Sequence, residues 1–171
     1  MNEVQRLIAY EEIRQLASRY ALALDSRDLD ALVGLFVDDV QVGRQGTGRE
    51  ILRADFDRQL HQVGITILHV TGHVIDVDNE DHASGVVSCR GEVQVDDRWI
   101  TQAIQYRDSY ERRKGRWYFA RREHLLWYGA EVGENPLLLP PANWPERHTG
   151  RGTLPESLES WQRFWNRNES D

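Results

Sequence analysis

Apolar residues in the first part of the chain recur every three or four positions, which is the spacing of an amphipathic helix. The pattern predicts a single helix over residues 3–25, with Asp25 at its end. The expected buried stripe of this helix comprises Val4, Leu7, Ile8, Ile13, Leu16, Ala17, Tyr20, Ala21 and Leu24.

Two further helices are expected before the period changes. Asp28 can cap a short helix that runs through Phe36, because an aspartate side chain accepts hydrogen bonds from the first free amides of a helix. After an alternating, strand-like run at residues 40–42, helical spacing returns over residues 49–61. The N-terminal part is therefore predicted to be largely helical.

From about residue 65 the apolar residues alternate with a period of two, as in β-strands. Three turn-forming clusters, at residues 78–81, 96–97 and 113–115, separate four such runs. Consecutive strands joined by short turns form an antiparallel meander. Because the helices come first and the strands later, the sequence predicts an α+β fold with the helices packed on one face of a curved sheet.

The chain changes character again at Tyr128, after which five prolines interrupt regular structure until a last helix. Thr153 and Glu156 have the spacing of a capping box for that helix. Its apolar face would comprise Leu158, Trp161, Phe164 and Trp165. We expect residues 1–128 to form one domain and residues 129–171 to form an extension that packs on this domain or on a neighbouring subunit.

The length, net charge and cysteine content of the chain exclude several classes of function. The 171 residues fit one domain, and 21 basic against 28 acidic residues give a net charge of −7, which disfavours nucleic acid as a partner. Cys89 is the only cysteine, so neither an internal disulfide nor a thiolate metal cluster is expected. Because no apolar run could span a bilayer and the N-terminus lacks the layout of a signal peptide, a cytoplasmic protein without membrane contacts is expected.

Two histidines stand in the first long strand-like run. Simple alternation would place His69 and His73 on the same face of the sheet. At about 3.3 Å per residue they would be roughly 13 Å apart, too far to share one ion, so no metal site is expected. The alternative to a functional role for His69 is a strand histidine satisfied by a backbone carbonyl.

Asp25 ends the first helix, where its negative charge opposes the helix dipole. The simple interpretation is a turn carboxylate. The alternative is a compensating partner such as His69, because a carboxylate bonded to one imidazole nitrogen raises the basicity of the other. Tyr20 lies about 140° from Asp25 around an ideal helix and would pack in the core, with a hydroxyl that needs a partner.

The last two strands contribute further polar candidates. Alternation puts three residues of each strand on a common face: Tyr106, Asp108 and Tyr110 on one strand, and Tyr118, Arg122 and His124 on the next. A guanidinium directed into a sheet-lined pocket needs an acid or a substrate oxygen, which makes Arg122 the most suggestive of these. The basic run at residues 112–116 is expected to be a solvated hairpin turn.

These segments resemble the SnoaL-like branch of the nuclear transport factor 2-like superfamily. The resemblance covers residues 5 to about 125 and rests on the order and spacing of the segments Tyr20 to Asp25, Gly48-Arg49-Glu50, His69-Val70-Thr71 and Tyr106 to Arg122. It implies a cone-shaped α+β barrel in which a curved sheet and the N-terminal helices enclose one deep, mostly apolar pocket.

Three enzyme groups of the superfamily are most similar: scytalone dehydratase, hexachlorocyclohexane dehydrochlorinase and bile-acid 7α-dehydratase. All pair an aspartate at the end of the first helix with a histidine in the first long strand, which implies a pair of Asp25 and His69. Tyr20 matches a tyrosine of the bile-acid enzyme, and Arg122 matches an arginine of the dehydrochlorinase. Because Arg44 replaces a tyrosine of scytalone dehydratase, scytalone is not the expected substrate.

The resemblance implies a dehydratase-like lyase or isomerase that needs no cofactor and acts on a small polycyclic, steroid-like or polyketide ring compound. His69 would remove a proton, Asp25 would orient and stabilise the imidazolium, and Tyr20 would donate to the developing oxyanion or departing hydroxyl. Substrate contacts are expected from Tyr106, Arg122, His73 and Arg44. Aldol-type cyclisation would suit the same cavity, whereas the Asp/Arg/Asp set of an epoxide hydrolase cannot be assembled.

The same fold also serves proteins without catalytic activity, such as the small subunits of ring dioxygenases, so a ligand-binding or scaffold subunit is the alternative function. Self-association as a dimer or trimer is expected because the open sheet face needs cover. The tail offers Trp144, Trp161 and Trp165 as anchors for it. The expected partners are thus a small ring substrate and further copies of this chain.

Overall fold

The computed structural model describes residues 1–143, 146 and 149–166, and its N-terminal part consists of three helices and a small hairpin. These elements are α1 (Glu3–Asp25), α2 (Leu29–Gly34), β1 (Gln41–Val42), β2 (Gly46–Thr47) and α3 (Arg49–Leu60). The side chain of Asp28 accepts a hydrogen bond from the Ala31 amide, which confirms its role as the cap of α2. Within the described residues no helix is both long and apolar enough to cross a membrane.

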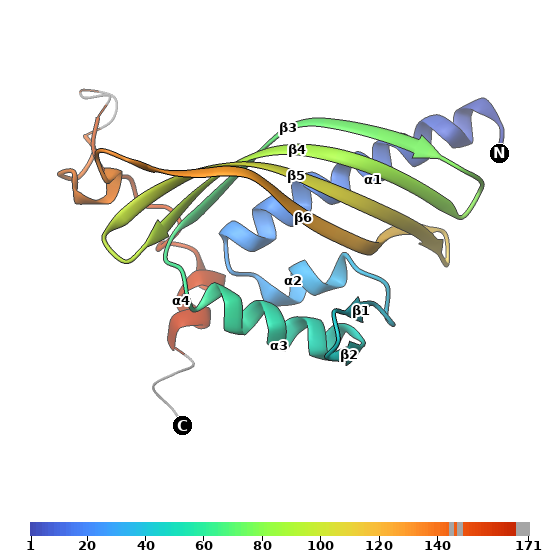
Figure 1. The fold of residues 1–171 in the computed structure, drawn as a ribbon, viewed down its shortest axis with the longest axis horizontal. Coiled ribbons are helices and arrows are strands. Elements are labelled where there is room, and N and C mark those ends of the chain that lie inside the picture. The colour runs from blue at the N-terminus through green and yellow to red at the C-terminus, as the bar shows by residue number, and fades with distance from the viewer. Residues whose placement is uncertain (144–145, 147–148, 167–171) are drawn as a thin grey trace.

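Four long strands form one antiparallel sheet that arches over the three helices (Figure 1). They are β3 (Thr66–Val77), β4 (His82–Val95), β5 (Arg98–Arg113) and β6 (Arg116–Val132), and their order in the sheet follows their order in the chain. The α+β class and the meander are therefore confirmed. Because β3 is an edge strand, the backbone groups on its free side need partners from the helices, and α1 runs beside it.

The core lies between the concave face of the sheet and the helices. Ile13, Leu16 and Tyr20 of α1 are buried, as expected, but Val4, Leu7 and Ile8 are exposed. At 100° per residue these last three residues fall on the side of the helix opposite the core face, so they do not continue the buried stripe. The sheet contributes fully buried side chains such as Val87 and Phe119 to the same core.

Three irregularities interrupt the strand pairing and decide which side chains face the core. The register of β3 against β4 shifts between Val70 and Gly72, and the register of β5 against β6 shifts twice. Ala120 and Trp127 are the unpaired residues of β6 at these two shifts. Because a shift of one residue moves the following side chains to the other face, alternation counted along the sequence fails beyond each bulge.

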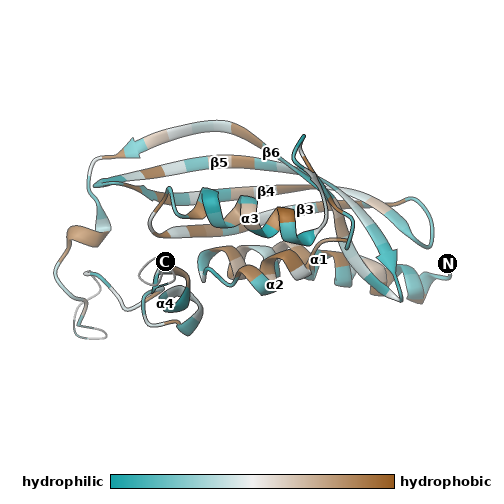
Figure 2. Ribbon diagram, turned by 90° about the horizontal axis from the view of Figure 1, so that it is seen from below, coloured by the Kyte–Doolittle hydropathy of each residue, from teal (hydrophilic) through white to brown (hydrophobic). Residues whose placement is uncertain are grey.

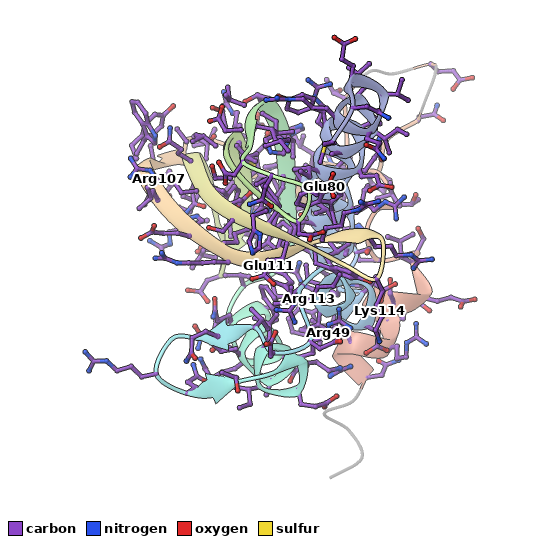
Figure 3. The ribbon with its side chains drawn as sticks, turned by 90° about the vertical axis from the view of Figure 1, so that its right-hand side faces the viewer. Arg49, Glu80, Arg107, Glu111, Arg113 and Lys114 are labelled. Atoms are coloured by element: carbon purple, nitrogen blue, oxygen red, sulfur yellow. The ribbon has the colours of Figure 1, made fainter. Side chains whose placement is uncertain are left out.

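The β5–β6 hairpin is the solvated turn that the basic run predicts. Lys114 and Gly115 have positive φ angles of 52° and 80°, and Arg113 reaches the carboxylates of Asp39 at 2.5 Å and Glu111 at 2.7 Å. Figure 3 shows Glu111, Arg113 and Lys114 at this end of the sheet with Arg49 nearby. Arg113 thus pairs with an exposed and a half-buried acid at this turn, while Lys114 and Arg116 are exposed.

The C-terminal segment packs on the same chain. After a short 3₁₀ turn at Pro136–Leu138, the last helix α4 (Glu159–Asn166) lies next to the turn between α1 and α2 (Figures 1 and 2), where Ser160 Oγ donates to the Ser26 carbonyl at 2.8 Å. The predicted capping box is wrong, because α4 begins three residues after Glu156 and the preceding residues form turns. Pro155 lies within a turn over residues 154–157, which ends before α4 begins.

Arg27 is the residue that fixes α4 in place. This arginine is 2% exposed, has a φ of +57°, and donates to the carbonyls of Leu24 and Gly64 and to Thr66 Oγ1. Its guanidinium lies 4.8 Å from the ring of Trp161. Trp161 is therefore buried inside the chain and is not available as an anchor between subunits.

Trp165 is likewise used internally, because its ring packs against Phe164 and Trp161. The third predicted anchor, Trp144, lies outside the described residues. Self-association stays a prediction, without the two tryptophans of α4 as its contacts.

Gly85 in β4 occupies a position with no room for a side chain. A Cβ atom there would lie 2.9 Å from the Val74 carbonyl oxygen and 3.2 Å from Nε2 of His73. We expect Gly85→Ala to lower the free energy of unfolding by about 1–3 kcal/mol, as overpacking does. Gly72→Ala is the matched control, because its nearest neighbour would be 3.9 Å away. Urea unfolding followed by tryptophan fluorescence measures both, and equal stability of the two variants would contradict the packing argument.

Candidate active site

A cavity of about 320 Å³ opens between the concave face of the sheet and helices α1 and α3. Its floor is formed by the buried side chains of Tyr20, Tyr106 and Arg122, and its walls include Phe36 and Phe56. The rim is polar and comprises Gln41, Asp55, Gln59, Arg121 and His124. A mostly aromatic floor with a few polar groups is the usual construction of a small-molecule site.

Arg122 is held at the floor by a buried acid. It stands directly opposite Asp108 across β5 and β6, and its Nε and Nη2 donate to the two carboxylate oxygens at 2.9 and 2.6 Å. The guanidinium carbon also lies 4.3–4.4 Å from the ring centres of Tyr20, Tyr106 and Phe119. Asp108 is thus the acid that a guanidinium inside the sheet requires.

A chain of hydrogen bonds continues from Asp108 to His73. Tyr110 donates its hydroxyl hydrogen to Asp108 at 2.8 Å, and Nε2 of His73 lies 2.9 Å from the same hydroxyl. Since the only hydrogen of that hydroxyl is committed to Asp108, Nε2 of His73 is the donor and Nδ1 carries no hydrogen. Burial lowers the pKa of His73 to about 4, so the ring is neutral at pH 7. His73 is therefore linked to Arg122 through Tyr110 and Asp108, and it does not line the cavity.

The hydroxyls of Tyr20 and Tyr106 make no hydrogen bond to any residue that the structure describes, although both side chains are buried. Burial raises the pKa of Tyr20 to about 12 and raises the pKa of Tyr106 further above its ordinary value. Both phenols therefore keep their hydrogens at neutral pH. They are free donors that face the cavity.

His124 is a base at the rim of the cavity. The sequence pattern predicts the correct face of the sheet for it, but His124 was not among the expected site residues. It stands opposite Tyr106 across β5 and β6, with the two rings 5.4 Å apart. Desolvation lowers the pKa of His124, which keeps the imidazole neutral and able to accept a proton at pH 7. Its alternation with Arg122 along β6 was the available signal. The bulge at Ala120 turns Tyr118, which was expected on the same face, to the other side of the sheet.

Asp25 does end α1, but its compensating partners differ from the expected histidine. Thr66 Oγ1 donates to Oδ1 at 3.0 Å, and the Leu68 amide of the β3 edge donates to Oδ2 at 2.8 Å. Burial raises the pKa of Asp25 to about 6, while these hydrogen bonds and the charges of Arg27 and His69 act in the opposite direction. Asp25 is therefore a carboxylate with a pKa near neutrality.

Asp25 also lines a second hollow, an apolar groove of about 300 Å³ between the end of α1, the start of β3 and the C-terminal segment. The other residues of this groove are Leu22, Ser26, Ile65, Thr66, Ile67, Leu154, Pro155 and Leu158. The cavity that contains Tyr20 is a separate hollow, since the two share no lining residue.

No hydrogen bond joins His69 to Asp25 in the described structure. The side chain of His69 is 53% exposed, and its Nε2 lies 3.7 Å from the Glu92 carboxylate. His69 pairs with exposed Arg90 on β4, whereas His73 pairs with fully buried Val87, so the two histidines face opposite sides of the sheet. The expectation of a common face is wrong because the bulge between Val70 and Gly72 reverses the alternation.

The structure thus brings only some of the predicted site residues together. Tyr20, Tyr106 and Arg122 meet at the floor of the cavity, and His73 lies behind them. Asp25 and His69 do not line this cavity, and no hydrogen bond joins them in the described structure. Arg44, the remaining predicted contact, is exposed in the turn between β1 and β2 and does not line the cavity.

Comparison with known proteins places the same fold among several enzymes. The model of the SnoaL-like domain matches residues 5–123. Hexachlorocyclohexane dehydrochlorinase LinA-type3 from Novosphingobium barchaimii is 22% identical over 77% of this chain and 95% of its own, with a TM-score of 0.70. A scytalone-dehydratase-like protein from Novosphingobium aromaticivorans is 21% identical over 78% of this chain and 94% of its own, with a TM-score of 0.68.

A protein of unknown function from Mycobacterium tuberculosis is similar as well, with 23% identity over 70% of this chain and 77% of its own and a TM-score of 0.61. A search of curated proteins by sequence found no match. At these identities the solved structures establish the fold, and the chemistry must be argued from the residues of this chain.

Proposed function

The chain belongs to the SnoaL-like family of the nuclear transport factor 2-like superfamily, and on this premise we propose that it is a lyase or isomerase that works without a cofactor. The substrate would be a small ring compound, of the polycyclic, steroid-like or polyketide type, bound in the cavity of about 320 Å³. The observation that carries this proposal is the combination at one cavity of free phenol donors, a paired guanidinium and a neutral imidazole.

In the proposed reaction His124 removes a proton from a carbon atom of the ring next to a carbonyl or a leaving group. Tyr20 and Tyr106 donate to the oxygen on which negative charge develops, and Arg122 stabilises that charge. A positioned base contributes typically about 10² to 10⁴-fold, and oxyanion donors about 10² to 10³-fold each. A bound ring that packs against the aromatic walls would displace water from the floor, which would strengthen both effects.

A pair of Asp25 and His69 is the competing catalytic assignment. The pKa of about 6 for Asp25 favours it, because a carboxyl group poised near neutrality is typical of functional sites. The position of His69 disfavours it, since the imidazole is half exposed beside Glu92. For this pair to act, His69 would have to leave Glu92 and reach a carboxylate whose oxygens already accept two hydrogen bonds.

Two histidine variants separate the assignments. We expect His124→Ala to lower kcat at least about 100-fold on ring ketones and β-hydroxy ketones that the wild type converts, because the base is lost. His69→Ala is the matched control and should keep turnover within about twofold. Thermal unfolding of both variants checks that they fold. The opposite result, a large loss in His69→Ala alone, would assign the chemistry to the Asp25 side.

The same experiment addresses the alternative of a ligand-binding or scaffold subunit. Absence of turnover in the wild-type protein across the panel, combined with saturable binding of the same compounds, would contradict the enzyme and favour the binding module. Turnover that depends on His124 would exclude it.

A further inference from the structure

The apolar groove of about 300 Å³ beside Asp25 has no part in the proposed reaction. Its walls are mostly aliphatic and come from the end of α1, the start of β3 and the C-terminal segment. Leu22 and Leu154 are 71% and 67% exposed, so the groove is open to solvent. Ile65 and Leu158 pack against a buried cluster that contains Trp161. The groove is therefore an apolar surface with well-packed residues behind it.

Asp25 is the one ionisable side chain among the described residues that line this groove. A carboxylate can accept about four hydrogen bonds, and the described chain supplies one to each oxygen, both from β3. Acceptor capacity thus remains for a donor that enters the groove. Burial raises the pKa of Asp25 to about 6 although the charges of Arg27 and His69 act in the opposite direction, so these two residues compensate its negative charge only in part.

From this combination we propose that the groove binds amphipathic cations, in which an unbranched alkyl chain lies along the aliphatic walls and a primary ammonium group pairs with the carboxylate of Asp25. This site is distinct from that of the proposed function, because the groove and the cavity that contains Tyr20 share no lining residue.

The charge and the openness of the groove favour this ligand over other apolar molecules. An ammonium group brings three donors and the opposite charge, whereas an alkyl carboxylate would be repelled and a neutral chain would leave Asp25 without a charged partner. Burial of an ion pair is costly when both ions lose all their water. Because the groove is open, the ammonium keeps part of its water shell and this cost is reduced.

The test is the binding of octylammonium, measured by isothermal titration calorimetry at pH 7.5, where Asp25 is mostly ionised. Octanol and octanoate carry the same chain with a neutral and a negative head group. Octylammonium should bind about tenfold more tightly than octanol, because hydrogen bonds to charged groups are strong, and octanoate should bind more weakly than either. Hexylammonium should bind roughly tenfold more weakly than octylammonium, at roughly threefold for each methylene group.

Two variants with matched controls locate the site. Asp25→Asn should abolish the preference for the ammonium over octanol, whereas Asp30→Asn, which changes the net charge equally at an exposed acid outside the groove, should retain it. Leu22→Lys places a positive charge at the groove and should weaken octylammonium binding at least about tenfold. Leu7→Lys should leave the affinity unchanged, because Leu7 is 67% exposed on the same helix but does not line the groove. Leu154→Lys is the second choice if Leu22→Lys does not fold.

Equal affinity of the wild type for octylammonium and octanol, or a preference for the ammonium that survives in Asp25→Asn, would overturn the inference. A wild-type dimer that binds no octylammonium and becomes a monomer in Leu22→Lys would also overturn it, because the groove would then hold a second copy of the chain. Since the assay measures binding at the groove, activity that depends on His124 without any octylammonium binding would refute this inference alone and leave the proposed function intact.

Discussion

Replacing Asp108 by Asn is expected to lower the free energy of unfolding by about 3–5 kcal/mol, which is the usual effect of removing one partner of a buried ion pair. Arg122 would keep its charge with only 5% of its side chain exposed, and the carboxylate that accepts two of its hydrogen bonds would be gone. Tyr110 would lose its charged acceptor as well. Urea unfolding at pH 7 measures the loss.

A double variant provides the control for this prediction. Asp108→Leu combined with Arg122→Met removes both charges together, and we expect it to recover most of the stability, because apolar pairs of similar size often replace buried ion pairs without cost. Tyr110 then retains His73 as its partner. If the single Asp108→Asn variant were as stable as the wild type, the pair would not be the support of the cavity floor that the structure indicates.

Asp25→Asn is expected to stabilise the protein at pH 7 by up to about 3 kcal/mol, since a pKa raised from 3.8 to about 6 corresponds to about 1.4 kcal/mol per unit. The folded state binds the proton of Asp25 more tightly than the unfolded state does. The contribution to stability is therefore greatest below pH 3.8 and is lost as the pH rises to 6. At pH 3.5 the variant and the wild type should be equally stable.

His73 acts in the opposite direction and hides this effect in the wild-type protein. Its pKa falls from 6.5 to about 4 on folding, so its contribution to stability is present above pH 6.5 and is lost as the pH falls towards 4. Between pH 4 and 6 the loss of stability with rising pH that Asp25 causes and the gain that His73 causes nearly cancel. Asp25→Asn removes the loss, so urea unfolding at several pH values should then show a free energy of unfolding that rises with pH.

Asp30→Asn serves as the control for Asp25→Asn, because Asp30 is an exposed acid whose side chain is 82% accessible. Its replacement should change neither the stability nor its pH dependence measurably. A destabilised Asp25→Asn at pH 7 would mean that the hydrogen bonds from Thr66 and Leu68 outweigh the burial of the charge.

Residues that are retained for function commonly lower the stability of the protein, as the ionised side chain of Asp25 is expected to do at neutral pH. This consideration keeps Asp25 of interest whichever histidine is the base. Stability measurements on Asp25→Asn and activity measurements on His69→Ala and His124→Ala address the two questions separately.

The sequence by itself determined the elements and their order. Periods of 3.6 and 2 residues are imposed locally by which side chains must be buried, and the caps and turns that separate the elements are read from a few residues such as Asp28 and Gly115. The alternation of Tyr106, Asp108 and Tyr110 was likewise predictable, because β4 and β5 pair without a register shift. The need of Arg122 for an acid also followed from its residue type.

Only the tertiary structure decided which candidates meet. The bulges in β3 and β6 depend on how whole strands pair, so the opposite orientations of His69 and His73 have no local signal in the sequence. The partners of Asp25 depended on the edge strand β3. The Leu68 amide on its free side and the Thr66 hydroxyl compete with any histidine for the carboxylate. Local periodicity fixes the strands, but cross-strand register and sheet edges decide which face each side chain occupies and what it can reach.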